Sequence, residues 1–234
     1  MSIRKPDEES LGIAERLIGV RFREKRYLVE ALTHRSVHVN DKTKRDNERL
    51  EHLGDAILGF VIVQYLFRGF PDKEEGWMTS VESVLFRTST LAQLAEKLGL
   101  ADCLFLGDKR VLENPTSRVK ILGSAMEALI AAIYLDQGIG AAELFIIRHV
   151  MPKLKEVTAH LEEYSPKCLL QNTSQEFFKV TPTYKVLKEE GLDHDRTFYV
   201  GVYIGKQLAG RGVGKSIKEA EEGAARNALA KSQL

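Results

Sequence analysis

Three carboxylates on one predicted helix are the residues of this chain best suited to chemistry. Glu48, Glu51 and Asp55 stand at positions i, i+3 and i+7, which places them within about 60° of one another on a helix. The apolar run 56–63 follows at once, so we expect a core helix that carries its acidic face partly inward. Carboxylates held together there repel one another and are costly to desolvate, and a divalent cation relieves both effects.

Part of this cluster has a simpler interpretation. Acidic residues in the first turn of a helix are stabilised by the helix dipole. That accounts for Glu48 and Glu51. It accounts poorly for Asp55, which lies two turns in and among apolar residues. On the three residues alone, both interpretations remain open.

A second apolar segment supplies a fourth carboxylate. Residues 121–135 carry no charge except Glu127, and they are too few and too interrupted for a bilayer span of about 20 apolar residues. We expect the central helix of a core, in which a lone glutamate needs a partner. One arrangement is a Mg²⁺ site, with Mn²⁺ as a possible substitute, shared by Glu51, Asp55 and Glu127. The alternative is a hydrogen bond from Glu127 to Arg49 or Arg35.

Composition sets the broad class. The 234 residues are enough for one large domain or two small ones, and the net charge of +1 argues nothing by itself. Cys103 and Cys168 are far apart and predict free thiols in a reducing compartment. The first ten residues lack the apolar stretch of a signal peptide. We therefore expect a cytoplasmic protein with no membrane partner.

The pattern of elements changes near residue 164. Residues from about 11 to 160 predict helices only, including one over 47–68, one opened by a capping box at Thr90, and one over 119–136 ended by Gly138. The remainder predicts a helix over 167–178, strands over 182–190, 198–204 and 207–212, and a helix over 217–232. We expect an all-α domain over 10–161 followed by a small α+β domain, ordered α-β-β-β-α, over 165–234.

These segments resemble a known family over nearly the whole chain. Residues 47–58 resemble the signature segment of the ribonuclease III family, and residues 121–136 resemble its second acidic helix. Residues 165–234 resemble a double-stranded-RNA-binding domain, through Pro182-Thr183-Tyr184, Asp193-His194, residues 212–216 and Lys218-Glu219-Ala220-Glu221. The order of the two parts is that of the bacterial two-domain members.

The resemblance implies a Mg²⁺-dependent endoribonuclease that acts as a homodimer through its helical domain. It would hydrolyse double-stranded RNA, leave 5′-phosphate and 3′-hydroxyl ends, and process rRNA and mRNA precursors. Carried over by position, Glu51 and Glu127 would be Mg²⁺ ligands and Asp55 would complete the centre. Asp55 and Glu127 would be the catalytic pair. Glu48 would lie at the edge, positioning RNA or a second cation.

The C-terminal domain offers candidate RNA contacts. Gln171 and Gln175 lie i, i+4 on the first predicted helix, and His194 lies in the loop between two strands. Lys215 and Lys218 bracket the start of the last helix, where exposed N–H groups and the dipole favour phosphate. The alternatives are ordinary solvated charge for the lysines and ordinary surface amides for the glutamines.

Two residues depart from the family pattern. Ser124 stands three residues before Glu127, where the family has an aspartate that helps to bind the metal, and His52 stands where an aromatic residue is usual near the dimer interface. We expect Ser124 to weaken metal binding and slow cleavage. Two other functions stay open: a double-stranded-RNA-binding protein with an impaired nuclease centre, and a structural RNA-associated dimer. Retention of all four carboxylates argues against the structural dimer.

Overall fold

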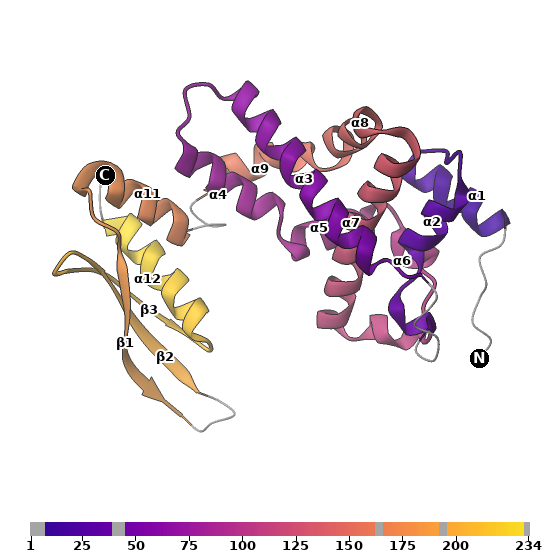
Figure 1. Cartoon of the computed structure of the whole chain (residues 1–234). Helices are drawn as coiled ribbons and strands as arrows, with labels where there is room; N and C mark the ends of the chain where they lie inside the picture. Colours follow the sequence, from indigo (N-terminus) through magenta and orange to yellow (C-terminus); the bar gives the residue numbers. More distant parts are fainter. Residues whose placement is uncertain (1–7, 39–44, 162–165, 192–195, 232–234) are drawn as a thin grey trace. The chain divides into compact units, whose positions relative to one another are not determined.

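The computed structural model describes residues 8–38, 45–161, 166–191 and 196–231. Its contacts divide the chain into two units: residues 1–69 with 85–155, and residues 70–84 with 156–234. The helical expectation for the first part of the chain and the α+β expectation for the last part are both confirmed (Figure 1). Cys103 and Cys168 are free thiols, as predicted.

The first unit is helical. Its elements are α1 (Glu8–Ile18), α2 (Lys25–Leu32), η1 (Arg35–His38), α3 (Glu48–Gly69), α5 (Thr88–Lys97), α6 (Leu100–Cys103), η2 (Lys109–Glu113), α7 (Pro115–Gln137), α8 (Ile139–His149) and η3 (Met151–Lys153). The only extended pairing among its described residues is an isolated bridge between Thr33 and Phe105.

Helix α7 forms the centre of this unit. Its middle has no exposed polar stripe, and an unbroken run from Ala128 to Ile133 is buried. Helices α3 and α5 make its most extensive contacts (Figure 1). The helix begins where Asn114 accepts a hydrogen bond from the Ser117 N–H at 2.9 Å, and it ends at Gly138, which has φ of +86°. Both ends therefore follow ordinary capping chemistry.

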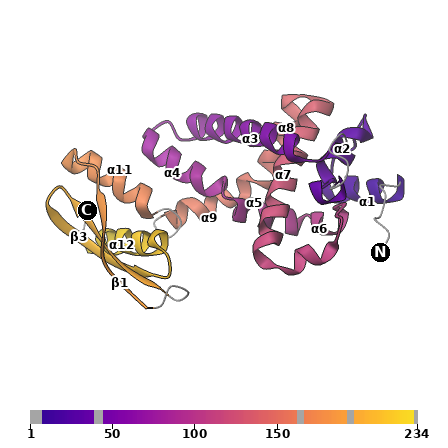
Figure 2. The same cartoon turned by 60° about the horizontal axis from the view of Figure 1, so that its bottom comes forward.

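The second unit contains the sheet. Besides α4 (Glu75–Leu85) and α9 (Leu154–Ala159), which lie at its boundaries, it comprises α11 (Pro166–Phe178), β1 (Thr183–Glu190), β2 (Thr197–Ile204), β3 (Gln207–Gly214) and α12 (Ile217–Lys231). The strands form an antiparallel sheet in the order β1-β2-β3. Helices α11 and α12 pack on one of its faces (Figure 2).

Glycines let α12 lie directly on β3. A Cβ added to Gly210, Gly212 or Gly214 would stand 2.4 Å, 2.1 Å or 2.6 Å from a backbone atom of α12. The buried residues of α12 are also small: they are Ala220, Ala224, Ala225 and Ala228. Backbone and methyl groups therefore make most of this interface.

Several boundaries differ from the sequence expectation. The helix expected from Thr90 begins at Thr88, so Thr90 lies inside α5, where its side chain is buried. The capping-box assignment was therefore wrong. The helix expected from 119 begins at Pro115, because proline is well suited to the first helical position.

Helix α3 is long and apolar enough, by length and composition, to cross a membrane, alone among the described helices. Core helices of soluble proteins pass the same test. Leu58, Ile62 and Leu66 of α3 are fully buried within the protein, as expected for a core helix.

Candidate functional site

The first turns of α3 carry three of the four predicted carboxylates. The N–H of Glu51 donates to the Asn47 carbonyl at 2.8 Å, which begins the helix. Glu51 is half-buried, whereas Glu48 and Asp55 are exposed. Glu48 is also held by Arg35, whose Nη1 lies 3.0 Å from Oε1 of Glu48. Arg35, which we had considered as a partner for Glu127, thus pairs with Glu48 instead.

Gly54 brings α3 against the backbone of α7 at the fourth carboxylate. A Cβ at Gly54 would stand 1.8 Å from the carbonyl oxygen of Glu127, far inside any allowed contact. Gly54 lies between Glu51 and Asp55 in the sequence. The contact therefore places those two residues beside Glu127 and fixes the spacing of the two helices there. Gly54 is a residue that sequence reasoning missed, although a glycine inside an acidic, otherwise apolar helix is the signal for such an approach.

The electrostatics of Glu127 reflect this convergence. Its pKa is raised to about 7, first by burial and then by the negative charges of Asp55 and Glu51. Among the described residues, no hydrogen bond or ion pair reaches its carboxylate, so the alternative partnership with Arg49 or Arg35 is not seen. The structure places Asp55 and Glu51 close enough to Glu127 to raise its pKa, and among the described residues no cationic side chain forms an ion pair with any of the three.

A cavity opens beside the acidic cluster. It has a volume of about 290 Å³. Its lining combines two carboxylates, Glu48 and Glu51, with the cationic side chains of Arg35 and Lys120 and with hydroxyl groups. The complete lining is His34, Arg35, Asn47, Glu48, Glu51, Val111, Ser117, Lys120, Ile121 and Ser124. Ser124 is therefore at the cluster, as its position predicted. Lys120 was missed, because a lone lysine one turn before Ser124 has no pattern of its own.

Asn47 is the other residue that sequence reasoning missed. It is only 2% exposed, and its side-chain Nδ2 has no hydrogen-bond partner within the described parts of the chain. An unsatisfied buried amide costs about 1–3 kcal/mol. Asn47 lines the same cavity as Glu48 and Ser124, so an acceptor there, from water or substrate, would satisfy it.

The carboxylates suit Mg²⁺ in their chemistry. Mg²⁺ prefers oxygen ligands and usually combines one or two carboxylates with several waters. The raised pKa of Glu127, caused in part by Asp55 and Glu51, shows a negative site that a cation would neutralise. In the described ranges, however, no three His, Cys, Asp or Glu side chains are gathered closely enough to form a complete metal cage. The residues therefore fit a hydrated ion held by a partial protein shell.

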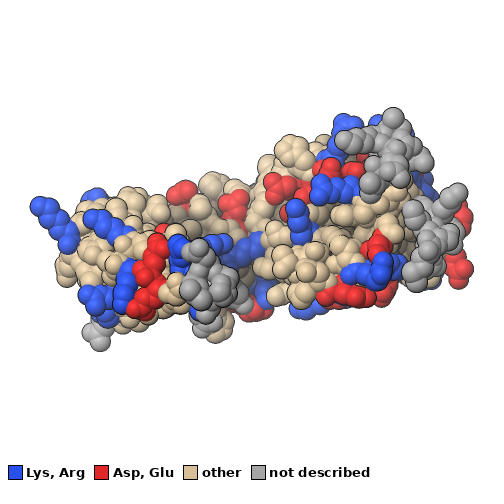
Figure 3. All heavy atoms as spheres, turned by 90° about the horizontal axis from the view of Figure 1, so that it is seen from below, with Lys and Arg blue, Asp and Glu red and all other residues tan. Residues whose placement is uncertain are grey.

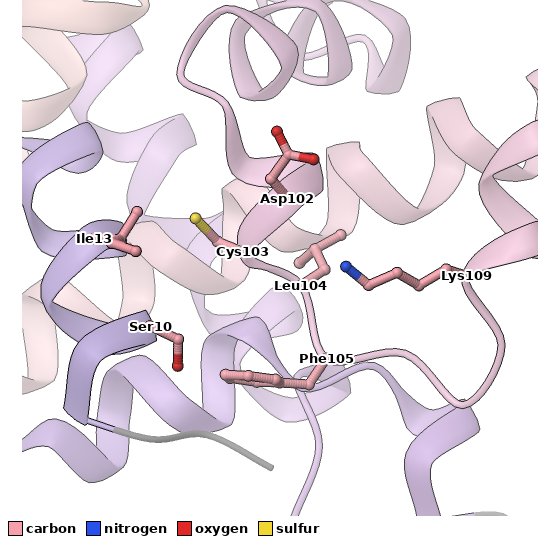
Figure 4. Close-up of a pocket in the computed structure, with 7 residues that line it drawn as sticks. All are labelled: Ser10, Ile13, Asp102, Cys103, Leu104, Phe105 and Lys109. Carbon is pink, nitrogen blue, oxygen red and sulfur yellow. The ribbon is translucent and has the colours of Figure 1, made fainter. Parts of the chain in front are cut away.

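A second cavity, of about 150 Å³, has a different lining (Figure 4). Cys103, Phe105 and Ile13 surround it together with Ser10, Asp102, Leu104 and Lys109. It includes none of the predicted site residues, so we assign it no part in the acidic centre.

The predicted RNA contacts lie on the helices of the second unit. Gln171 and Gln175 are both exposed on α11, and Gln175 Nε2 donates to Thr181 Oγ1 at 3.1 Å. Lys215 and Lys218 flank the start of α12 as predicted, with Lys215 Nζ 3.2 Å from Thr197 Oγ1. Ser216 Oγ accepts from the N–H of Glu219 and caps this helix. His194 lies outside the described residues.

Charged side chains of both signs are present on the face shown in Figure 3. Figure 3 shows Lys and Arg side chains beside Asp and Glu side chains over the visible face, in keeping with a net charge of +1. The whole-chain charge therefore gives little indication of a nucleic-acid partner. That indication comes from local features such as the start of α12.

Two family models match the chain. A ribonuclease-III-like model matches residues 24–154, which include all four carboxylates. A double-stranded RNA binding motif matches residues 166–232, which include α11, the sheet and α12.

Curated relatives match along nearly the full length. A protein named Ribonuclease 3 from Geobacter sulfurreducens is 41% identical over 92% of this chain and 88% of its own length. The protein of that name from Pelotomaculum thermopropionicum is 36% identical over 98% of this chain and 96% of its own length.

A solved structure agrees with the helical part. The nuclease domain of ribonuclease III from Campylobacter jejuni matches with a TM-score of 0.55 and 32% identity, over 61% of this chain and 96% of that domain. Together with the acidic cluster at the α3–α7 contact and the double-stranded-RNA-binding fold that follows it, these similarities show that the chain belongs to the ribonuclease III family and is an endoribonuclease of that type.

Proposed function

We propose that this protein hydrolyses double-stranded RNA in a Mg²⁺-dependent reaction at the α3–α7 contact. The observation that carries the proposal is the contact of α3 with α7 at Gly54, which places Glu51 and Asp55 beside Glu127 and accords with the raised pKa of Glu127. The charges of Asp55 and Glu51 both act on Glu127, and among the described residues no cationic side chain forms an ion pair with any of the three, which favours a divalent cation. The match to the ribonuclease-III-like model over residues 24–154 supports the same centre.

In this proposal Glu51, Asp55 and Glu127 hold the ion. When bound, Mg²⁺ supplies an activated water and stabilises charge on the leaving oxygen. Glu51 and Glu127 are half-buried and would fix the ligand positions, whereas Asp55 is exposed to solvent. Glu48 positions RNA or a second cation. Departure of the 3′ oxygen leaves a 3′-hydroxyl and a 5′-phosphate.

The cavity beside the cluster suits the RNA backbone. Arg35 and Lys120 line it together with Glu48 and Glu51, so a phosphate that these carboxylates would repel also meets two cationic side chains. Arg35 can exchange Glu48 for a phosphate oxygen, because guanidinium binds both groups in the same way. The backbone would then be held close to the carboxylates.

The active form in this proposal is a homodimer. Helix α3 exposes Phe60, Val63 and Phe67, which are 57%, 40% and 70% exposed, and α8 exposes Leu144, which is 69% exposed. Large apolar side chains grouped in this way are typical of an interface. His52 is exposed on the same helix. The Campylobacter jejuni structure is described as concerning a region involved in dimer formation of its nuclease domain.

Residues of the second unit bind the duplex. The match to the double-stranded RNA binding motif supports contacts from Gln171, Gln175, Lys215 and Lys218. His194, which stands between the β1 and β2 segments in the sequence and outside the described residues, would contact a second minor groove. The resemblance further suggests processing of rRNA and mRNA precursors in the cytoplasm.

The experiment that tests the nuclease compares the unmodified protein with Ser124→Asp on long double-stranded RNA. Mg²⁺ is titrated and the initial cleavage rate is measured. Because Mg²⁺ prefers carboxylate to hydroxyl oxygen, Ser124→Asp should cleave faster and reach its half-maximal rate at lower Mg²⁺. If neither protein cleaves at any Mg²⁺ concentration, the proposed function is wrong.

A second function is favoured by one observation. Ser124 lines the cavity where another carboxylate would complete the cluster, so the chain could bind double-stranded RNA while cutting it poorly. The same titration separates the two functions. Cleavage by Ser124→Asp alone, with equal RNA affinity for both proteins, would favour a binding protein with an impaired centre.

A further inference from the structure

The outer face of the C-terminal sheet lies opposite its helices. On β2, Phe198, Val200, Val202 and Ile204 belong to or pack against the core beneath α11 and α12. Side chains alternate between the two faces of a strand. Tyr199, Gly201 and Tyr203 therefore lie on the other face, where no described helix covers them.

Strand pairing builds an ordered surface around these three residues. Tyr199 pairs with Lys188 and Val213, Gly201 with Lys185 and Arg211, and Tyr203 with Thr183 and Leu208. A Cβ at Gly201 would meet side-chain atoms of Leu208, Leu187 and Tyr203, which places those side chains on the same face. We call this the outer sheet surface: Lys185, Leu187, Lys188, Tyr199, Tyr203, Leu208, Arg211 and Val213.

Aromatic and cationic groups are interleaved on the outer sheet surface. Lys185 Nζ lies 5.4 Å from the centre of the Tyr203 ring, and Lys188 Nζ lies 5.9 Å from that of Tyr199. Val213 and Leu187 are 54% and 45% exposed. Positively charged surfaces with aromatic rings are the ordinary means of binding unpaired nucleotides, because bases stack on the rings while cations contact the phosphates.

The two ends of the outer sheet surface differ in charge. At the Tyr199 end, Glu190 pairs with Lys188 and accepts a hydrogen bond from the Tyr199 hydroxyl at 2.9 Å. Across the middle, Lys185 and Arg211 flank Gly201, and neither forms an ion pair with a carboxylate among the described residues. The half containing Tyr203, Lys185 and Arg211 is therefore free to bind an anion.

We propose that the outer sheet surface binds single-stranded RNA that flanks the duplex. Tyr203 stacks on an unpaired base, Lys185 and Arg211 contact the adjoining phosphates, and Tyr199, about 13 Å along the strand, receives a further base. Paired bases inside a duplex hide their faces, so the ligand is an unpaired flank. This inference rests on the proposed function, because the flank belongs to an RNA whose duplex is bound by α11 and the start of α12.

The test measures the affinity of the 234-residue protein for two RNA probes. Divalent cations are left out so that no cleavage occurs. One probe is a blunt RNA duplex of about 16 base pairs. The other carries a single-stranded flank of about eight nucleotides. The flank should raise affinity at least about fivefold. Tyr203→Leu should abolish most of this gain, Tyr203→Phe should keep it because the ring remains, and Arg211→Gln should reduce it. None of these three substitutions should change the affinity of the protein for the blunt duplex.

Lys231→Gln is the matched control, because it removes one positive charge from the same unit at the exposed end of α12. It should leave the gain from the flank unchanged. The inference is overturned if the flank adds no affinity in the unmodified protein, or if Tyr203→Leu weakens both probes equally. It is also overturned if Tyr203→Leu keeps the gain but alters oligomeric state, which would indicate a protein contact. Failure of the unmodified protein to bind the blunt duplex would count against the proposed function instead.

Discussion

At Glu127, the negative charge that would bind a cation also lowers the stability of the fold. It is the one charged residue in the buried middle of α7, and its pKa lies near 7 because burial and two neighbouring carboxylates disfavour its ionised form. A charge that destabilises the fold without its cation is expected at a functional site. Its effect on stability can therefore be measured through pH.

The expected direction follows from proton binding. Because the folded-state pKa of about 7 exceeds the ordinary value of 4.5, the folded protein holds the proton more tightly than the unfolded chain. The free energy of unfolding should therefore fall as pH rises from 4.5 through 7, by at most about 3 kcal/mol. Without metal, Glu127→Gln should raise the melting temperature at pH 8 and change it little at pH 4.5.

Thermal unfolding with and without a chelator checks this expectation. Added Mg²⁺ should stabilise the unmodified protein at pH 8 more than Glu127→Gln, because binding to the folded state raises stability. Equal melting temperatures for the two proteins at both pH values, without metal, would contradict the electrostatic account of Glu127.

Residues with a periodic position could be predicted, and residues with a purely spatial role could not. Glu51, Asp55 and Glu127 could be selected as candidates because helical spacing and an apolar background make a carboxylate conspicuous. The Arg35–Glu48 ion pair joins η1 to α3, and only the fold brings these elements together. The buried Nδ2 of Asn47, which has no hydrogen-bond partner among the described residues, is likewise visible only once burial is known.

At the scale of elements, the contact between α3 and α7 decides the geometry of the centre. The missing side chain at Gly54 lets the two backbones meet at Glu127. A bulkier residue there would separate the helices, and with them the carboxylates on either side. A bulkier residue at position 54 should therefore lower both the free energy of unfolding and the rate of cleavage.

Gly54→Ala tests that dependence. Its Cβ would stand 1.8 Å from a backbone oxygen, so we expect a loss of at least about 2 kcal/mol in the free energy of unfolding and loss of cleavage. Chemical denaturation and a cleavage assay measure the two effects. Gly140→Ala in α8 is the matched control, because nothing lies within 4 Å of its Cβ. It should be neutral or slightly stabilising. Full activity of Gly54→Ala would contradict the role of this contact.

The start of α12 gives a second expectation at this scale. Lys215 and Lys218 flank a helix N-terminus capped by Ser216. Replacing both lysines with alanine should weaken binding to duplex RNA and lower the slope of log affinity against log salt, because fewer counterions are released. Affinity measured across a salt series checks this. An unchanged slope would remove the phosphate role of the two lysines.

Elements with strong periodicity or clear ends were predicted well. Helices α3 and α7 and all three strands lie within a few residues of their expected positions. The prediction that Thr90 caps a helix was wrong because a capping pattern carries no information on burial. Packing against α7 favours Thr90 as an interior residue of α5. The Gly54 contact required two helices to be placed together, which spacing within one helix does not reveal.

At the scale of the whole molecule, α3 exposes large apolar side chains that no other described element covers. Phe60 and Phe67 lie on that helix, and such exposure is costly unless another surface covers it. In the proposed homodimer this surface is buried, and each acidic centre lies on a helix that also forms the interface.

Phe67→Glu should therefore shift the protein to monomers, because a charge in an apolar interface is strongly disfavoured. Sedimentation equilibrium gives the mass directly. Phe177→Glu on α11 is the control, since Phe177 is 60% exposed and Phe67 is 70% exposed. If the unmodified protein is itself monomeric at micromolar concentration, or if Phe67→Glu retains the dimer mass, the proposed interface is wrong.

The glycines of β3 that face α12 have a thermodynamic consequence for RNA binding. Where Gly210, Gly212 and Gly214 meet α12, the helix rests on main chain and has few rotatable groups beneath it. Little configurational freedom is left to lose when its first turn meets a phosphate. Calorimetry on a blunt duplex should then show a small heat-capacity change, governed by ion and water release, without the large negative value that accompanies coupled folding.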